Sequence, residues 1–100
     1  MTSFTTAVNI GASADFEIEG AKFVGGLQSH KFVGPASVTK NEATHIQFGP
    51  SAHYWVDGNI DATSNVNFRL KLTVHGFGNG WFRVLGVDYA GDGTWHDFHV

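Results

Sequence analysis

The fold is decided by a stretch of the sequence that begins with Asn65-Val-Asn-Phe-Arg-Leu-Lys-Leu-Thr-Val-His75. Apolar and polar residues alternate along it, and successive side chains of a strand point to opposite faces of a sheet. A helix would spread the same residues around its whole circumference. The alternation therefore predicts a strand with one apolar face, which buries Phe68, Leu70 and Leu72 in a core.

The stretch continues with a glycine-rich segment, Gly76-Phe-Gly-Asn-Gly80, and returns as Trp81-Phe-Arg-Val-Leu-Gly-Val-Asp88. Glycine tolerates positive φ, which a tight reversal requires. The returning segment is rich in β-branched and aromatic residues, which favour strands. We therefore predict one long antiparallel hairpin over residues 65–88, with one face in the core and the other facing water or a partner.

Short segments with strand-like alternation recur along the rest of the chain, separated by glycine, proline and polar residues. No segment has the periodicity of an amphipathic helix. Turns or breaks are predicted at 11–14 and 49–51, and strands at 5–10, 15–19, 30–33, 44–48, 53–57 and 94–100. The pattern predicts a single all-β domain over residues 1–100, an antiparallel β-sandwich or small barrel of about eight short strands.

The composition argues against several classes of function. The net charge is −3 and the six Lys and Arg residues are scattered, so the chain lacks the basic cluster that binds a nucleic-acid backbone. It has no cysteine, which excludes disulfides and thiolate metal sites. The first residues lack a signal-peptide pattern, and no apolar run approaches the ~20 residues that span a bilayer. We therefore expect a cytoplasmic protein that does not insert into membranes.

Six histidines raise the question of a metal site. No pair has the helical spacing of a zinc protease motif, and His96 and His99 would face opposite sides of a strand. Three histidines from separate strands stay an alternative, but we expect exposed or hydrogen-bonded imidazoles and no metal or other cofactor. The acidic segment 88–97 has Ala90 where a calcium loop needs an oxygen ligand, so its Asp-Gly pair at 92–93 predicts a turn instead.

Catalysis has little support in the sequence. No serine lies in a Gly-x-Ser-x-Gly elbow. Asp15, Glu17 and Glu19 share one face of a predicted strand, which is more typical of a solvated sheet face than of an acid/base pair in a cleft. We expect a protein that is not an enzyme.

Two segments, 53–59 and 88–97, combine aromatic rings with Asp, Asn and His beside glycine turns. A sugar stacks its apolar C–H face on an aromatic ring, and its hydroxyls bond to short polar side chains around that ring. The alternative is that the tryptophans belong to the core, where large aromatic side chains gain most. The predicted sugar-binding residues are His53, Tyr54, Trp55, Asp57, Asn59, Asp92, Trp95, His96 and Asp97.

In its Met1-Thr-Ser3 start and its segments His53-Tyr-Trp55 and Gly93-Thr-Trp-His-Asp97, the chain resembles the small cysteine-free lectins of mushroom fruiting bodies. It looks in particular like the α-galactosyl-binding lectin type known from Lyophyllum. The resemblance implies a fungal, cytoplasmic lectin that binds galactosides and cross-links glycans as a homodimer. It assigns no site residue by position.

Two other classes of function stay as alternatives. One is a structural or protein-interaction β domain whose aromatic residues serve only the core and a dimer interface. The other is a small β-barrel enzyme or a binder of an apolar ligand. Exposed tryptophan beside Asp or Asn favours the lectin, three buried tryptophans favour the interaction domain, and an enclosed cavity favours the third class.

Overall fold

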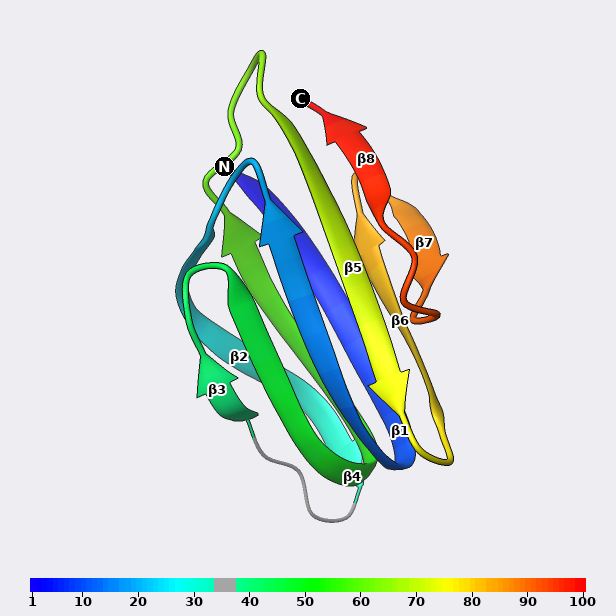
Figure 1. Ribbon diagram of the computed structural model, residues 1–100. Coiled ribbons are helices and arrows are strands. Elements are labelled where there is room, and N and C mark those ends of the chain that lie inside the picture. Colours follow the sequence, from blue (N-terminus) through cyan, green and yellow to red (C-terminus); the bar gives the residue numbers. More distant parts are fainter. Residues whose placement is uncertain (34–37) are drawn as a thin grey trace.

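The computed structural model describes residues 1–33 and 38–100, with the side chains at 10–12, 26, 28–33 and 51–54 left out of the description (Figure 1). These residues form strands and no helix. The strands are β1 (Thr2–Glu19), β2 (Phe23–Val33), β3 (Val38–Asn41), β4 (His45–Ile60), β5 (Asn67–His75), β6 (Asn79–Val84), β7 (Val87–Ala90) and β8 (His96–His99).

Two long strands, β1 and β4, organise the fold. They run antiparallel to each other from the pair Thr2–Ile60 to the pair Glu17–His45. The first half of β1 also pairs with β6 and its second half with β5. The second half of β4 pairs with β2 and its first half with β3. The result is two antiparallel sheets that share β1 and β4: sheet 1, in the order β2-β4-β1-β6-β7, and sheet 2, in the order β3-β4-β1-β5-β8. The predicted all-β sandwich is confirmed.

The breaks predicted at 11–14 and 49–51 are wrong. β1 and β4 continue through both segments, and their pairing shifts register between Asn9 and Ala12 and again between Ala12 and Ala14. Such a shift inserts an unpaired residue and bends the strand. The small residues that suggested turns therefore lie where β1 and β4 cross between sheet 1 and sheet 2.

The strand predicted from the alternation at 65–75 is confirmed as β5, with Phe68, Leu70 and Leu72 only 4%, 0% and 0% exposed. The predicted hairpin partner is wrong. β6 does not pair with β5, because the connection 76–78 crosses from sheet 2 to sheet 1 and carries β6 to the first half of β1. β5 and β6 therefore lie in opposite sheets, and the apolar face of each strand packs against the core between them.

The hairpin that does form joins β6 to β7 (Figure 1). Its two turn residues, Leu85 and Gly86, have φ values of 54° and 79°. Positive φ at both central positions is the geometry of a type I′ turn, whose twist matches that of the flanking strands. The sequence prediction ran one strand through this turn because Leu85 gives no turn signal.

The core lies between the two sheets and is rich in phenylalanine. The ring of Phe16 lies 5.1–5.3 Å from those of Phe4, Phe23 and Phe82, measured between centroids. Phe82 comes from β6 in sheet 1, whereas Phe16 lies in the half of β1 that belongs to sheet 2. These contacts hold the two sheets together and leave the polar residues of each strand on the outer faces.

Candidate functional site on the outer face of sheet 2

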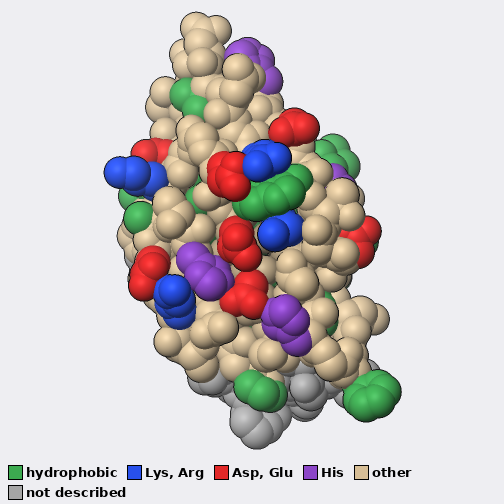
Figure 2. All heavy atoms as spheres, viewed as in Figure 1, with side chains coloured by type: hydrophobic (Ala, Val, Ile, Leu, Met, Phe, Trp, Pro, Cys, Tyr) green, Lys and Arg blue, Asp and Glu red, His purple; other side chains and the backbone are tan. Residues whose placement is uncertain are grey.

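The outer face of sheet 2 carries the polar residues that alternate with the core residues. Figure 2 shows this face, where acidic, basic and histidine side chains surround one hydrophobic group in the middle of the sheet. The residues of this face include Asp15, Glu17 and Glu19 of β1, His45 and Gln47 of β4, Arg69, Lys71, Thr73 and His75 of β5, and Trp95 and Asp97 at β8.

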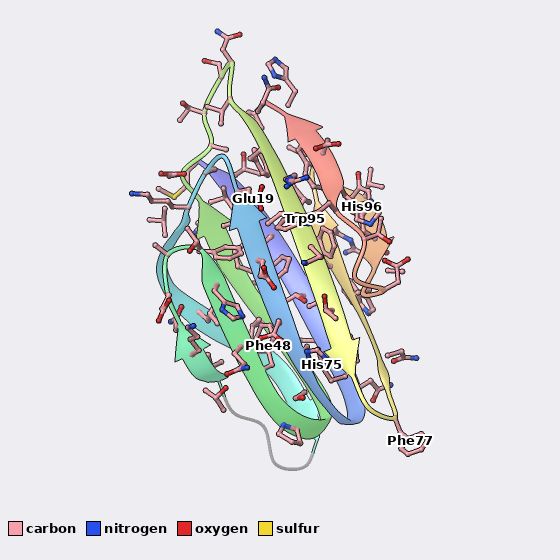
Figure 3. The ribbon with its side chains drawn as sticks, viewed as in Figure 1. Glu19, Phe48, His75, Phe77, Trp95 and His96 are labelled. Carbon is pink, nitrogen blue, oxygen red and sulfur yellow. The ribbon has the colours of Figure 1, made fainter. Side chains whose placement is uncertain are left out.

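Trp95 lies on this face between two cations. The Arg69 Cζ and the Lys71 Nζ lie 4.4 Å and 4.6 Å from the centroid of its indole ring. At these distances both side chains make cation–π contacts. The ring is half-buried, so part of its surface stays open to solvent. Figure 3 labels Trp95 between Glu19 and His96.

Each of the two cations has a carboxylate partner from β1. The Nε and Nη2 of Arg69 donate to Glu19 Oε2 at 2.8 Å and 2.5 Å. The Lys71 Nζ lies 3.9 Å from Glu17 Oε2, a much looser ion pair. Arg69 is therefore fixed in place more firmly than Lys71.

An open pocket of about 460 Å³ adjoins Arg69 at the end of the sheet. Its lining residues are Glu19, Gly20, Asn67, Phe68, Arg69, Asp97 and Phe98. Gly20 has a φ of +88°, and a Cβ at this position would lie 2.6 Å from the backbone oxygen of Asn67. Glycine is therefore required where the turn after β1 closes against β5 and forms one wall of the pocket.

A second cluster on the same face is centred on Asp15. His45 Nε2 lies 2.7 Å from Asp15 Oδ1 and His75 Nε2 lies 2.6 Å from Oδ2, while the Gln47 amide donates to Oδ1 at 3.2 Å. Burial raises the pKa of Asp15, but the hydrogen bonds from His75 and His45 and the charges of both rings outweigh it, so the pKa lies below its usual value. An ionised carboxylate only accepts, so both imidazoles donate through Nε2–H.

The cluster around Asp15 is not arranged as a metal centre. Among the side chains that the structure describes, which leave out those of His30 and His53, no group of three or more His, Asp or Glu has the geometry to hold a metal ion. Both imidazole Nε2 atoms instead point at the carboxylate oxygens as hydrogen-bond donors.

The structure brings together two of the predicted site residues, Trp95 and Asp97, which share the outer face with Arg69. His96 points to the other side of the strand, where its ring lies 4.7 Å from that of Tyr89 and 5.8 Å from that of Phe82. Its Nε2 is buried without a hydrogen-bond partner in the described part of the chain. His96 therefore does not contribute to a surface built on Trp95.

Asp92 shapes the bend that precedes Trp95. The backbone N–H of Thr94 donates to Asp92 Oδ1 at 3.1 Å, and Asp92 forms an isolated β-bridge with Thr73 of β5. Hydrogen bonds from the side chain and backbone of Thr94 lower the pKa of Asp92 below its usual value. At 92–93 the backbone forms a β-bridge and a bend and not the predicted hairpin turn, because β7 and β8 pair with different strands. This segment delivers Trp95 to the outer face of sheet 2.

The other predicted segment lies on the opposite side of the sandwich. Trp55, Asp57 and Asn59 belong to the half of β4 that pairs within sheet 1, with Val56 buried in the core between them. Trp55 contacts the ring of Trp81 edge-to-face at 6.2 Å. The side chains of His53 and Tyr54 lie outside the described residues. The structure therefore does not bring the two predicted segments into one site.

Four residues of the surface around Trp95 were not among the predicted site residues: Glu19, Asn67, Arg69 and Lys71. Alternation along residues 65–75 already placed Asn67, Arg69 and Lys71 on the polar face of a strand. Their proximity to Trp95 depends on the pairing of β5 with β8, which no local pattern encodes.

Comparison with family models, curated proteins and solved structures gave no significant match. Within the described residues there is no helix able to cross a membrane. The resemblance to mushroom lectins stays a prediction from the sequence.

Proposed function

We propose that the protein is a non-catalytic carbohydrate-binding protein whose sugar site is the outer face of sheet 2 around Trp95. The observation that carries the proposal is a partly exposed indole beside an open pocket that is lined by carboxylate, amide and guanidinium groups. A sugar ring would stack on Trp95 through its C–H face. Glu19 and Asp97 would accept hydrogen bonds from its hydroxyls, and charged acceptors make the stronger bonds.

The two cations at the indole decide how a ligand enters. A sugar that stacks on Trp95 must displace Arg69 or Lys71 from the ring. We expect Lys71 to move, because its ion pair with Glu17 is long at 3.9 Å, whereas Arg69 is held by two short bonds to Glu19. An exposed cation–π contact contributes about 0.5–1 kcal/mol, which a stacked sugar ring offsets. Arg69 then stays in place as a donor to sugar oxygens.

The choice of sugar rests on the resemblance to the mushroom lectins. It makes a galactoside the first ligand to test, and it supports a fungal source, a cytoplasmic location and a homodimeric assembly. These assignments are parts of the same proposal, and each has its own measurement.

The test combines a glycan array with titration of the best glycan by calorimetry. We expect the wild-type protein to bind a galactoside, and Trp95→Ala to weaken that binding by about tenfold or more, because stacking on the ring is lost. Trp81→Phe is the matched control, since it alters an indole on the opposite sheet. Melting temperatures of both variants show that the fold is kept.

Two results would count against the proposal. An array without any bound glycan would remove the proposed function itself. Loss of binding in a Trp55→Ala variant, with Trp95→Ala unaffected, would move the site to the outer face of sheet 1.

A further inference from the structure

Sheet 2 ends at β8, which pairs only with β5 in the described part of the chain. Val66 and Val100 exchange both of their backbone hydrogen bonds, at 3.1 Å and 2.9 Å. Hydrogen-bonded and non-hydrogen-bonded pairs alternate along an antiparallel ladder. Phe98 therefore also turns its backbone groups toward β5, while Asp97 and His99 direct theirs to the free edge.

This edge has only part of the usual protection. Native proteins protect an edge strand by keeping it very short, by charged side chains, above all lysine, by proline or a bulge, or by a cover. β8 is short and carries the acidic Asp97. The β8 sequence His96-Asp-Phe-His99 contains no proline or lysine, and its register with β5 is uninterrupted. Asp97 and His99 are both exposed. The edge is thus able to accept another strand.

We propose that β8 pairs antiparallel with β8 of a second copy of this chain, about a two-fold axis at Phe98. Asp97 then lies opposite the partner's His99, and His99 opposite the partner's Asp97. Both residues direct their backbone groups outward, so each pair exchanges two hydrogen bonds. A two-fold contact of this kind closes the assembly as a dimer.

Charge selects this register over its neighbours. An axis at Asp97 would also satisfy the backbone, but it would set two carboxylates directly opposite each other, which is destabilising. A slip by one residue would place Asp97 opposite the partner's Phe98 and invert the faces. In the proposed register a carboxylate instead faces an imidazole. The ring of His99 is already held on the outer face, because its Nδ1 lies 2.6 Å from Asn67 Oδ1.

The dimer would join two five-stranded sheets into one continuous sheet. Antiparallel pairing about a two-fold axis keeps both outer faces on the same side, so the two Trp95 surfaces would face one direction. The partner's His99 would lie beside Asp97, which lines the pocket next to Arg69. This last consequence rests on the proposed sugar site, whereas the dimer itself does not.

A charge-swap experiment tests the register. Sedimentation equilibrium is expected to give the wild-type protein twice the chain mass of 10.8 kDa at micromolar concentration. His99→Asp sets two carboxylates opposite each other in both pairs and is expected to weaken the dimer by about tenfold or more. Asp97→His combined with His99→Asp restores a carboxylate opposite an imidazole, and this double variant is expected to associate like the wild type.

The outcomes separate this inference from the proposed function. A wild-type protein that stays monomeric, or a folded double variant that fails to regain the dimer, overturns the inference. A stronger dimer in Asp97→His alone would also overturn it, because only an axis at Asp97 gains from that change. Binding of a monosaccharide glycoside tests the sugar site and is measured on the wild-type protein, because Asp97→His changes a proposed sugar ligand. A wild-type monomer that binds sugar refutes the dimer and leaves the sugar site standing, and a wild-type dimer that binds none refutes the sugar site and leaves the dimer standing.

Discussion

The carboxylate of Asp15 connects three strands of sheet 2. Asp15 belongs to β1, and its two oxygens accept hydrogen bonds from His45 of β4 and His75 of β5. Hydrogen bonds to a charged group are the stronger ones and contribute about 1.5–3 kcal/mol each. His75 is the last residue of β5, directly before the connection that crosses to sheet 1. The contact therefore fixes the end of β5 at the point where the chain leaves the sheet.

Replacing Asp15 with Asn is expected to destabilise the protein at pH 7 by about 1–3 kcal/mol, because both imidazoles lose a charged acceptor. The pKa of Asp15 is lowered in the folded protein. Its contribution is therefore complete above the unfolded value of about 3.9 and is lost as the pH falls through the lower folded value. Urea unfolding at a series of pH values between 7 and 2 measures this.

The matched comparison is the difference in free energy of unfolding between the wild type and Asp15→Asn at each pH. That difference should shrink as the pH falls from 5 toward 2. A difference that stays constant over this range would show that the carboxylate contributes no ionic stabilisation.

At the scale of the elements, local patterns predicted strands better than they predicted strand pairing. The alternation at Phe68, Leu70 and Leu72 defined β5 and its buried face, because one face of this strand packs in the core and the other is solvated. The same reasoning failed for the partner of β5. A glycine-rich segment permits a reversal but does not encode whether the returning strand joins the same sheet or the facing one.

The candidate site illustrates the same limit. Trp95, His96 and Asp97 were predicted together from their residue types, whereas alternation along the strand sets His96 on the other face from Trp95 and Asp97. Arg69 and Lys71 contact Trp95 only because β5 pairs with β8, a contact between segments distant in the sequence. Alternation gives the face of each residue, and the register of non-local strands gives its neighbours.

The β6–β7 turn offers a prediction at this scale. Leu85 has a φ of 54° and is 54% exposed, so an apolar side chain occupies a left-handed position with little burial in return. Asparagine adopts this conformation more readily, and Asn-Gly is the preferred pair of a type I′ turn. Leu85→Asn is therefore expected to stabilise the protein by about 0.5–1 kcal/mol. Leu85→Ile is the control, because a β-branched residue is less tolerant of positive φ, and it should destabilise. Thermal unfolding of both variants and of the wild type measures these effects. A Leu85→Asn protein that melts below the wild type would contradict this turn assignment.

At the scale of the whole molecule, the two outer faces of the sandwich differ in chemistry. The outer face of sheet 2 carries Trp95 among ion pairs, while that of sheet 1 carries Trp55 and Trp81 in contact with each other. Ala7 of β1 pairs with Trp55 of β4 and with Trp81 of β6, and it is only 3% exposed. The outer faces of the two sheets thus carry different side chains. A sheet extended through β8 would place two copies of the sheet 2 face side by side without covering either.

The proposed sugar site and the proposed dimer together predict that the protein cross-links glycans. Two sites on one continuous face raise the effective concentration of the second binding event, and overall avidity then exceeds single-site affinity by 10²–10⁴-fold where the spacing of the glycans fits.

We expect the wild-type protein to aggregate particles coated with a galactoside at a concentration at least about tenfold below that needed by His99→Asp. Aggregation is compared at equal occupancy of the sugar site, because His99→Asp keeps Trp95, Glu19 and Arg69 but removes the contact of His99 with Asn67, which lines the pocket. Turbidity of the particles and calorimetry with the monovalent glycoside provide the two measurements. Equal aggregation by a monomeric His99→Asp protein would show that cross-linking arises from another surface, and the outer face of sheet 1 would then be the surface to mutate.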